Sequence, residues 1–158
     1  LPERQRSYQE ARMTLSYGRT KHERGFFRYY EDCGILSNIF AGGVESAFAF
    51  CRSALGRLLE YDGENEGDLL ATLKLLLETN FNYSATAAEL FVHANTVRYR
   101  SDKIEQLLMR DLSDPDVRFN LYAAVRVQEI LVDMHILPDG YVGKVHEKVH
   151  GSEAAVNH

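Results

Sequence analysis

The chain has 158 residues, enough for one well-cored domain or two small ones. Hydrophobic residues make up 45% and charged residues 26%, which is ordinary for a soluble globular protein and argues against disorder. The formal net charge of −5 argues mildly against nonspecific nucleic-acid binding, so a nucleic-acid-binding segment must concentrate positive charge locally. No apolar run reaches bilayer length, so no membrane partner is expected.

The first 43 positions predict two helices and an aromatic segment. Residues 7–17 read as a helix with Ala11, Met13 and Leu15 on its apolar side, ended by Gly18. Residues 26–30 are aromatic and bounded by glycines, which predicts a short strand. Residues 35–40 follow as a short apolar helix. Because the first residue is Leu1 rather than Met, we expect the chain to be a piece of a longer protein.

A longer helix is predicted over 44–61, with apolar residues at helical spacing. The segment 62–68 follows with four acidic residues and two glycines, which predicts a linker and a domain boundary. Cys33 and Cys51 lie among residues expected to be buried and read as two unpaired thiols. A reducing, cytoplasmic setting follows from them.

Past residue 68 the pattern is purely helical. A leucine-rich helix over 69–79 is followed by a turn at 80–83, where Ser84 is well placed to cap a short helix through Phe91. The next helix is expected over 94–109. Asp114 and Pro115 then supply a cap and a first-turn proline for a helix to about Met134.

The segment 84–108 has the length of two helices joined by a tight turn, a helix-turn-helix. Ala87 is the small residue that lets the two helices approach each other. If His93 is the N-cap of the second helix, Val92 and Val97 form a hydrophobic staple across its first turn. Leu90, Ile104, Leu107 and Leu108 are expected to continue the core.

The polar face of the second helix favours DNA binding. Between His93 and Lys103 three fixed positive charges face one negative charge, so the local balance is positive within an acidic chain. We expect Asn95 to read adenine and Arg98 to read guanine or contact phosphate. Backbone amides at the start of either helix are expected to add to phosphate binding. The other predicted DNA contacts are Ser84, Thr86, His93, Ala94, Thr96, Tyr99, Arg100 and Lys103.

Several of these residues also have purely structural interpretations. Arg100 lies nearer the core flank, so a structural salt bridge competes with a DNA contact. His93 could act only as a cap, and Tyr99 could be a partly buried packing aromatic. A polar outer face on a helix pair is also typical of plain solvated surface.

A recognisable pattern over residues 69–131 is carried by Leu70, Thr72, Leu73, Asn80, Asn82, Thr86, Ala87, Leu90, His93, Asn95, Thr96, Val97, Tyr99, Arg100, Lys103, Ile104, Leu107, Asp111, Leu112 and the helix from Asp116. This pattern resembles the C-terminal helix-turn-helix of the purine-catabolism and sugar-diacid regulators (PucR/CdaR type). The resemblance implies a bacterial DNA-binding transcription regulator that acts on double-stranded DNA, as a homodimer, with its effector bound upstream of this chain. A weaker match at 7–11 and 30–34 resembles the end of the GGDEF-like middle domain of sugar-diacid regulators.

Two positions depart from expected patterns. The family usually has Arg between the His and the Asn, where this chain has Ala94, so operator sequence or affinity is expected to differ from relatives. Phe91 stands where many helix-turn-helix proteins have glycine, which suggests a slightly different turn.

Two alternatives remain open. His146, Glu147 and His150 match the H-E-x-x-H pattern of zinc hydrolases, but in a glycine-punctuated tail without a supporting helical core. A helical interaction module without DNA binding, dimerising through 44–61 and 116–134, is the second.

Taken together, the sequence predicts a mostly α protein, a helical bundle containing a helix-turn-helix DNA-binding domain. The expected division is the end of a middle domain with connecting helices (1–61), an acidic linker (62–68), the DNA-binding domain (69–137) and a tail (138–158). No enzyme activity, cofactor or metal is expected.

Overall fold

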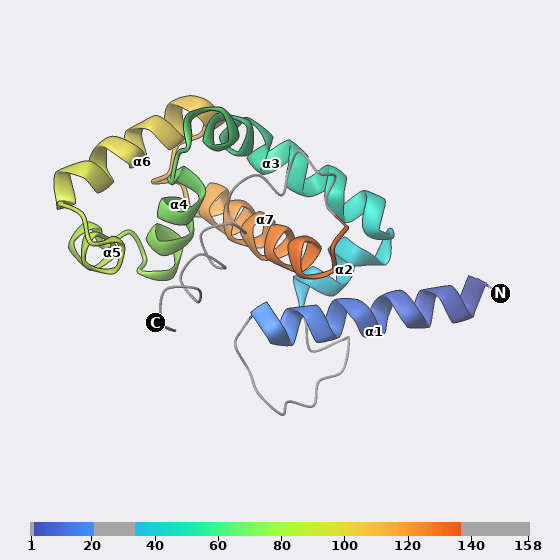
Figure 1. Cartoon of the computed structure of the whole chain (residues 1–158). Helices are drawn as coiled ribbons and strands as arrows, with labels where there is room; N and C mark the ends of the chain where they lie inside the picture. The colour runs from blue at the N-terminus through green and yellow to red at the C-terminus, as the bar shows by residue number, and fades with distance from the viewer. Residues whose placement is uncertain (1, 21–33, 137–158) are drawn as a thin grey trace, which may run out of the picture. The chain divides into compact units, whose positions relative to one another are not determined.

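The computed structural model describes residues 2–20 and 34–136 (Figure 1). The described residues form seven α-helices and no strand, which confirms the prediction of a mostly α helical bundle. The predicted strand at 26–30, the tail 138–158, Cys33 and the H-E-x-x-H residues lie outside the described part. The helices are α1 (Pro2–Thr20), α2 (Ile35–Ala41), α3 (Val44–Asn65), α4 (Leu69–Glu78), α5 (Tyr83–Leu90), α6 (Ala94–Leu108) and α7 (Pro115–Asp133).

The helices separate into two compact units. One contains Leu1–Gly56 and Leu108–Ile136, and the other contains Arg57–Leu107. The last helix therefore belongs to the same unit as the first two, although it lies next to the helix-turn-helix in sequence. The predicted domain boundaries follow chain order instead, and they stay a prediction.

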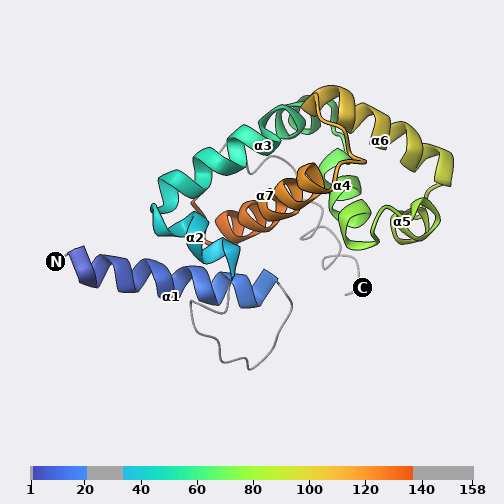
Figure 2. The same cartoon turned by 180° about the vertical axis from the view of Figure 1, so that it is seen from behind.

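In the first unit, α1 and α2 both pack against α7 (Figures 1 and 2). Asp114 caps α7 by accepting a hydrogen bond from the amide of Asp116, with Pro115 in the first turn, as predicted. Arg12 of α1 donates to the carbonyl oxygen of Met134 at 2.7 Å. The apolar residues of α7 that are buried in this unit include Leu121, Ala124, Val125, Val127, Ile130 and Leu131.

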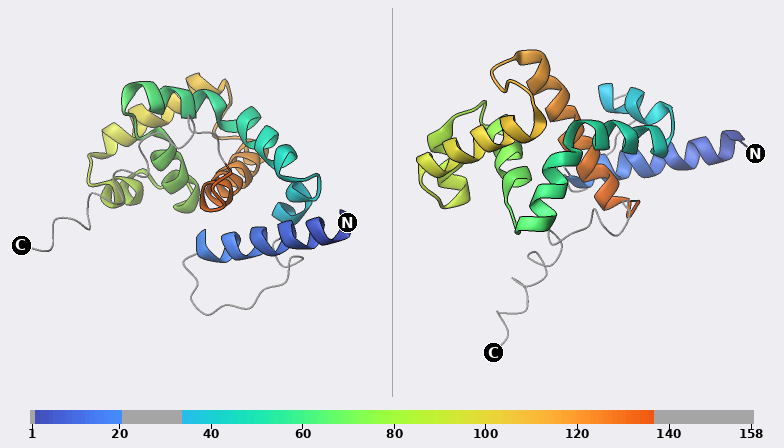
Figure 3. Two further views of the ribbon diagram at one scale, coloured as in Figure 1. Left: turned by 45° about the vertical axis from the view of Figure 1, so that its right-hand side comes forward. Right: turned by 90° about the horizontal axis from the view of Figure 1, so that it is seen from above.

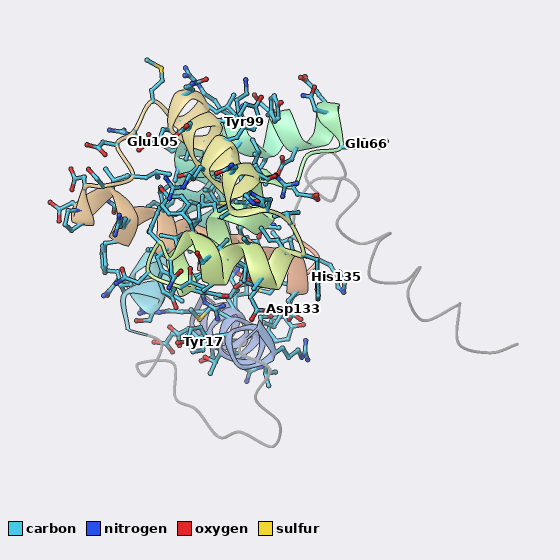
Figure 4. All side chains as sticks on the ribbon, turned by 90° about the vertical axis from the view of Figure 1, so that its left-hand side faces the viewer. Tyr17, Glu66, Tyr99, Glu105, Asp133 and His135 are labelled. Carbon is cyan, nitrogen blue, oxygen red and sulfur yellow. The ribbon has the colours of Figure 1, made fainter. Side chains whose placement is uncertain are left out.

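Helix α1 is longer than predicted and uses a different side for packing. It continues through Gly18 to Thr20. In its last turn, Arg19 forms an ion pair at 3.2 Å with Asp133, which is labelled in Figure 4. Met13 is buried, as expected, but Leu15 is 49% exposed and Ala11 is exposed. The predicted apolar side is therefore wrong for these two residues, because small residues near Met13 are buried in their place. The buried residues of α1 are Met13, Thr14, Ser16 and Gly18.

The acidic segment predicted as a linker is helical over its first half, since α3 continues to Asn65. Asp62 accepts hydrogen bonds from the amides of Leu69 and Leu70 at 3.0 and 2.8 Å and so supplies acceptors to the start of α4. A Cβ atom at Gly67 would clash with the Asp62 carboxylate, which explains the glycine there. This part of the acidic segment therefore has a structural role.

The second unit contains the end of α3 together with α4, α5 and α6 (Figure 3). Its central cluster joins Leu76 of α4, Ala87 of α5 and Val97 of α6. All three are nearly or fully buried, so each of the three helices contributes a side chain to one core. The partly buried residues packed against this cluster are Phe81, Tyr83, Leu90, Val92 and Ala94.

Candidate nucleic-acid interface

Helices α5 and α6 form the predicted helix-turn-helix, and α4 packs against α5. Ala87 is 5% exposed at the core that joins them, as expected for the small residue at a close approach. Val97 and Ile104 of α6 are fully buried. The opposite side of α6 therefore remains available to solvent.

The start of α5 is capped by a different residue from the one predicted. Asn82 is the N-cap, and its side-chain oxygen accepts a hydrogen bond from the amide of Ala85 at 3.0 Å. Ser84 lies inside the helix and is exposed, so the prediction of a Ser84 cap is wrong. The physical reason is that Asn82 has the extended backbone that an N-cap requires, whereas Ser84 is already helical.

The turn between α5 and α6 is built on Phe91, which has φ 55° and ψ 41°. Its amide donates to carbonyl oxygens of the last turn of α5, and the amide of Val92 donates to Ala87 at 3.0 Å. This is the left-handed conformation that glycine favours at a helix C-terminus. Phe91 thus adopts the left-handed conformation that glycine would adopt at this position.

The start of α6 agrees with the predicted cap and staple. The Nδ1 atom of His93 accepts a hydrogen bond from the amide of Asn95 at 3.1 Å, and the carbonyl of His93 accepts from Thr96 at 2.9 Å. Val92 packs against the cluster that contains Val97. The His93 side chain therefore already accepts the hydrogen bond of the Asn95 amide. At the start of α5, Asn82 accepts the hydrogen bond of the Ala85 amide in the same way. These two amides are therefore held by the caps, and phosphate binding by other backbone amides at the start of either helix stays a prediction.

The outer side of α6 exposes three of the predicted contacts at helical spacing: Asn95, Arg98 and Tyr99. Tyr99, labelled in Figure 4, is 69% exposed, so its alternative as a packing aromatic is wrong. Ser84 and His93 are exposed as well, and Thr96 and Lys103 are half-buried. Asn95, Arg98 and Tyr99 thus offer an amide, a guanidinium and a phenol on one surface.

Arg98 and Lys103 each lie over an aromatic ring of the same unit. The Arg98 guanidinium lies 5.4 Å from the ring centroid of Tyr83, the first residue of α5. The Tyr83 hydroxyl lies 3.5 Å from the hydroxyl of Ser101 on α6. Lys103 lies 5.1 Å from the ring centroid of Tyr61 at the end of α3. These cation–π contacts restrict the positions of the two cations while leaving them charged.

Arg100 makes structural contacts with α4. One of its nitrogens donates to the hydroxyl of Thr72 at 3.2 Å, and another lies 3.6 Å from the carboxylate of Asp68. Its side chain is 21% exposed. The structure therefore supports the salt-bridge interpretation of Arg100 over the DNA contact, and the positive charge of the outer face rests on Arg98 and Lys103.

Thr86 and Ala94 are directed into the domain. Thr86 is fully buried, and its hydroxyl lies 2.8 Å from that of Thr79, the C-cap residue of α4. The predicted DNA contact by Thr86 is therefore wrong, because its hydroxyl is buried and hydrogen-bonded to Thr79. Ala94 packs against the central cluster, which places its methyl group on the inner side of α6.

Sequence reasoning missed Tyr83 as a member of this site. Tyr83 was placed in a turn, and its contact with Arg98 depends on how α5 and α6 cross. The only local signal is an aromatic residue at the start of a helix that precedes a cationic helix, and that signal is weak. Among the described residues no group of three metal-ligating side chains occurs, and His146, Glu147 and His150 lie outside them.

Residues 69–127 match the model of the PucR C-terminal helix-turn-helix domain. The chain is 34% identical over 125 residues to the purine catabolism regulatory protein of Bacillus subtilis, covering 79% of this chain and 23% of that protein. It is 32% identical over 126 residues to the carbohydrate diacid regulator of Escherichia coli, covering 78% of this chain and 32% of that protein. A third relative, 25% identical over 135 residues, is the DNA-binding transcriptional activator AdeR of Bacillus subtilis, where the match covers 79% of this chain and 30% of that protein.

The chain thus spans between about a quarter and a third of the length of these relatives. No solved structure matches it. None of the described helices is long and apolar enough to cross a bilayer.

Proposed function

Residues 69–127 belong to the PucR C-terminal helix-turn-helix family, and on that premise we propose that α6 is the recognition helix that enters the major groove of operator DNA. The chain carries the DNA-binding domain of a transcription regulator of the PucR/CdaR type. The observation that carries the proposal is the outer side of α6, where Asn95, Arg98 and Tyr99 are exposed at helical spacing.

The chemistry of these side chains assigns a role to each. The Asn95 amide lies in the first turn of α6 and can donate to and accept from one adenine edge. Arg98 can form a bidentate contact with guanine or pair with a phosphate. Tyr99, Thr96, Lys103 and Ser84 can contact the phosphate backbone and thereby set the register of the helix. His93 would act mainly as the cap of α6.

The protein is expected to act in the cytoplasm as a homodimer on two related half-sites, with a small effector bound by a region outside this chain. The alternative interaction module would dimerise through 44–61 and 116–134, but the apolar residues of α7 such as Leu121 and Ile130 are already buried within their own unit. We propose no enzyme activity, because the relatives named above are regulators.

Selection of binding sites from random DNA tests the proposal directly. We expect an inverted repeat with a reproducible core. On that site, Arg98→Ala should weaken binding by roughly 10- to 100-fold, because one good contact to a base edge contributes about 1–3 kcal/mol. Lys103→Ala should weaken binding less and should make the dependence on salt less steep by about one unit of slope.

The matched control is Arg52→Ala, which removes an exposed arginine from α3 in the other compact unit. This variant should bind the selected site as the parent does. If Arg98→Ala and Lys103→Ala also bind like the parent while both stay folded, α6 is not the recognition helix. Failure to select any DNA site, with no DNA binding even at low salt, would favour the interaction module without DNA binding.

A further inference from the structure

Phe91 has an unusual combination of backbone and side-chain properties. Its φ of 55° places it in the left-handed region, where side chains other than glycine are strained. The residue is 95% exposed, more than any other large hydrophobic residue in the described part of the chain. Glycine would form this turn with less strain and would expose no apolar surface to water, so neither folding nor packing explains the ring.

The position of Phe91 points to an explanation. It lies three residues before α6 begins, directly before the helix end whose first turns contact base edges in a recognition helix. The turn is fixed in place by the Val92 amide, which donates to the Ala87 carbonyl, and by Val92 packing on the core. A rigid turn holds the exposed ring at this end of the helix. Strained residues of this kind are concentrated at binding sites, where the surrounding structure holds them in place.

The chemistry of the ring limits what it can recognise. A phenyl group neither donates nor accepts a strong hydrogen bond and carries no charge. On the major-groove edge of DNA the matching apolar group is the C5-methyl of thymine. We propose that Phe91 is a specificity-determining residue that contacts a thymine methyl group of the operator next to the bases contacted by α6. This inference rests on the proposed function of α6.

The test uses Phe91→Gly in the whole chain, measured on the operator selected by the parent. We expect the melting temperature to rise, because the strain is relieved, and the affinity to fall roughly 3- to 10-fold. A rise in melting temperature together with a fall in affinity indicates a contact between the ring and DNA. A purely structural role of Phe91 would lower both the melting temperature and the affinity, or neither. Phe91→Asn should weaken binding similarly, since Asn tolerates the left-handed region and keeps the turn less flexible than glycine does.

Met109 offers a matched control, because it has φ 53°, is 73% exposed and follows the other end of α6. Met109→Gly makes the same kind of change at a left-handed residue and should leave the affinity for the operator unchanged. A similar loss in Met109→Gly would mean that flexibility at a helix end, not the ring of Phe91, affects binding, and would overturn the proposal.

Replacing each operator thymine in turn by deoxyuridine removes one methyl group at a time. For the parent, one such replacement should weaken binding 3- to 10-fold, and for Phe91→Gly the same replacement should have no effect. If Phe91→Gly binds like the parent, or no thymine methyl matters, the proposal is wrong. Phe91→Gly could also lower the affinity equally for the unmodified operator and for every deoxyuridine-substituted operator. That result would place the ring on another part of the DNA and overturn the thymine contact.

The Arg98→Ala variant separates this inference from the proposed function. Weaker binding by Arg98→Ala with parental binding by Phe91→Gly refutes the Phe91 contact alone. Parental binding by both refutes the assignment of α6 as well. A defect of Phe91→Gly that appears only in transcription, with operator affinity intact, assigns the ring to a protein partner and overturns the DNA contact.

Discussion

At the scale of single residues, side chains of similar type serve different purposes within one helix pair. Arg98 is exposed on α6 and stays near Tyr83, while Arg100, two positions along, turns toward α4 and binds Thr72 and Asp68. The two arginines point to different sides because residues two positions apart in a helix do not share a face. Sequence reasoning left the role of Arg100 open, since only the position of α4 decides it.

The hydroxyl pair of Thr86 and Thr79 gives a prediction about the core. Thr86→Val keeps the shape of the side chain but removes its hydroxyl, which lies 2.8 Å from that of Thr79. Because a buried hydrogen bond contributes about 1 kcal/mol, the free energy of unfolding should fall by about that amount. Denaturant titration measures the loss. Operator affinity of the fully folded variant should equal that of the parent, and a drop would restore Thr86 as a DNA contact.

Cys51 gives a prediction that depends on pH. Burial raises the pKa of its thiol from 9.0 to about 12, so the folded state holds the proton more tightly than the unfolded state does. The stabilisation from this difference is full below pH 9 and is lost as the pH rises toward 12. In a Cys33→Ser background, Cys51 should react with a thiol reagent at pH 8 only after denaturant is added. Rapid reaction without denaturant would contradict the burial of Cys51.

At the scale of elements, each helix start in the second unit has its own acceptor. Asn82 caps α5, His93 caps α6, and Asp62 reaches from α3 to the first amides of α4. The sequence linked a His93 cap to a staple of Val92 and Val97, and both are present. It assigned the cap of α5 to Ser84 instead of Asn82. Both residue types are good caps, so only the backbone conformation of the folded chain decides between them.

The corrected cap can be tested with a pair of alanine variants. Asn82→Ala should lower the free energy of unfolding by about 1 kcal/mol, because the amide of Ala85 loses its acceptor. Ser84→Ala, two positions away and exposed, should change it by less than about 0.5 kcal/mol. Chemical denaturation of both variants measures the difference. Equal losses in the two variants would return the cap to Ser84.

At the scale of the whole molecule, helices far apart in sequence form one unit. α7 follows the helix-turn-helix in the chain, yet it packs with α1 and α2. The family match at 69–127 therefore ends inside a helix whose packing partners lie before it in the chain. The local Asp114–Pro115 signal predicted the start of α7 correctly, but it could not say which helices pack against α7.

A fragment of residues 69–136 should be markedly less stable than the whole chain. It lacks α1 and α2, which pack on α7, so residues such as Val127, Ile130 and Leu131 lose part of their cover. Each apolar side chain of this size contributes about 1.5–3 kcal/mol when fully buried. Circular-dichroism melting should show a lower midpoint, and a dye that binds exposed apolar surface should bind more. A fragment that melts as high as the chain would contradict this dependence.

The sequence by itself determined the helices, because the 3.6-residue apolar period, the Asp114–Pro115 start and the Val92–Val97 staple are local features. It also placed Asn95, Arg98 and Tyr99 on the polar side of α6. Tertiary structure decided which polar residues remain on the surface, since burial of Thr86 and pairing of Arg100 depend on α4. It also decided how α7 is covered, because packing joins residues whose distance along the chain carries no pattern.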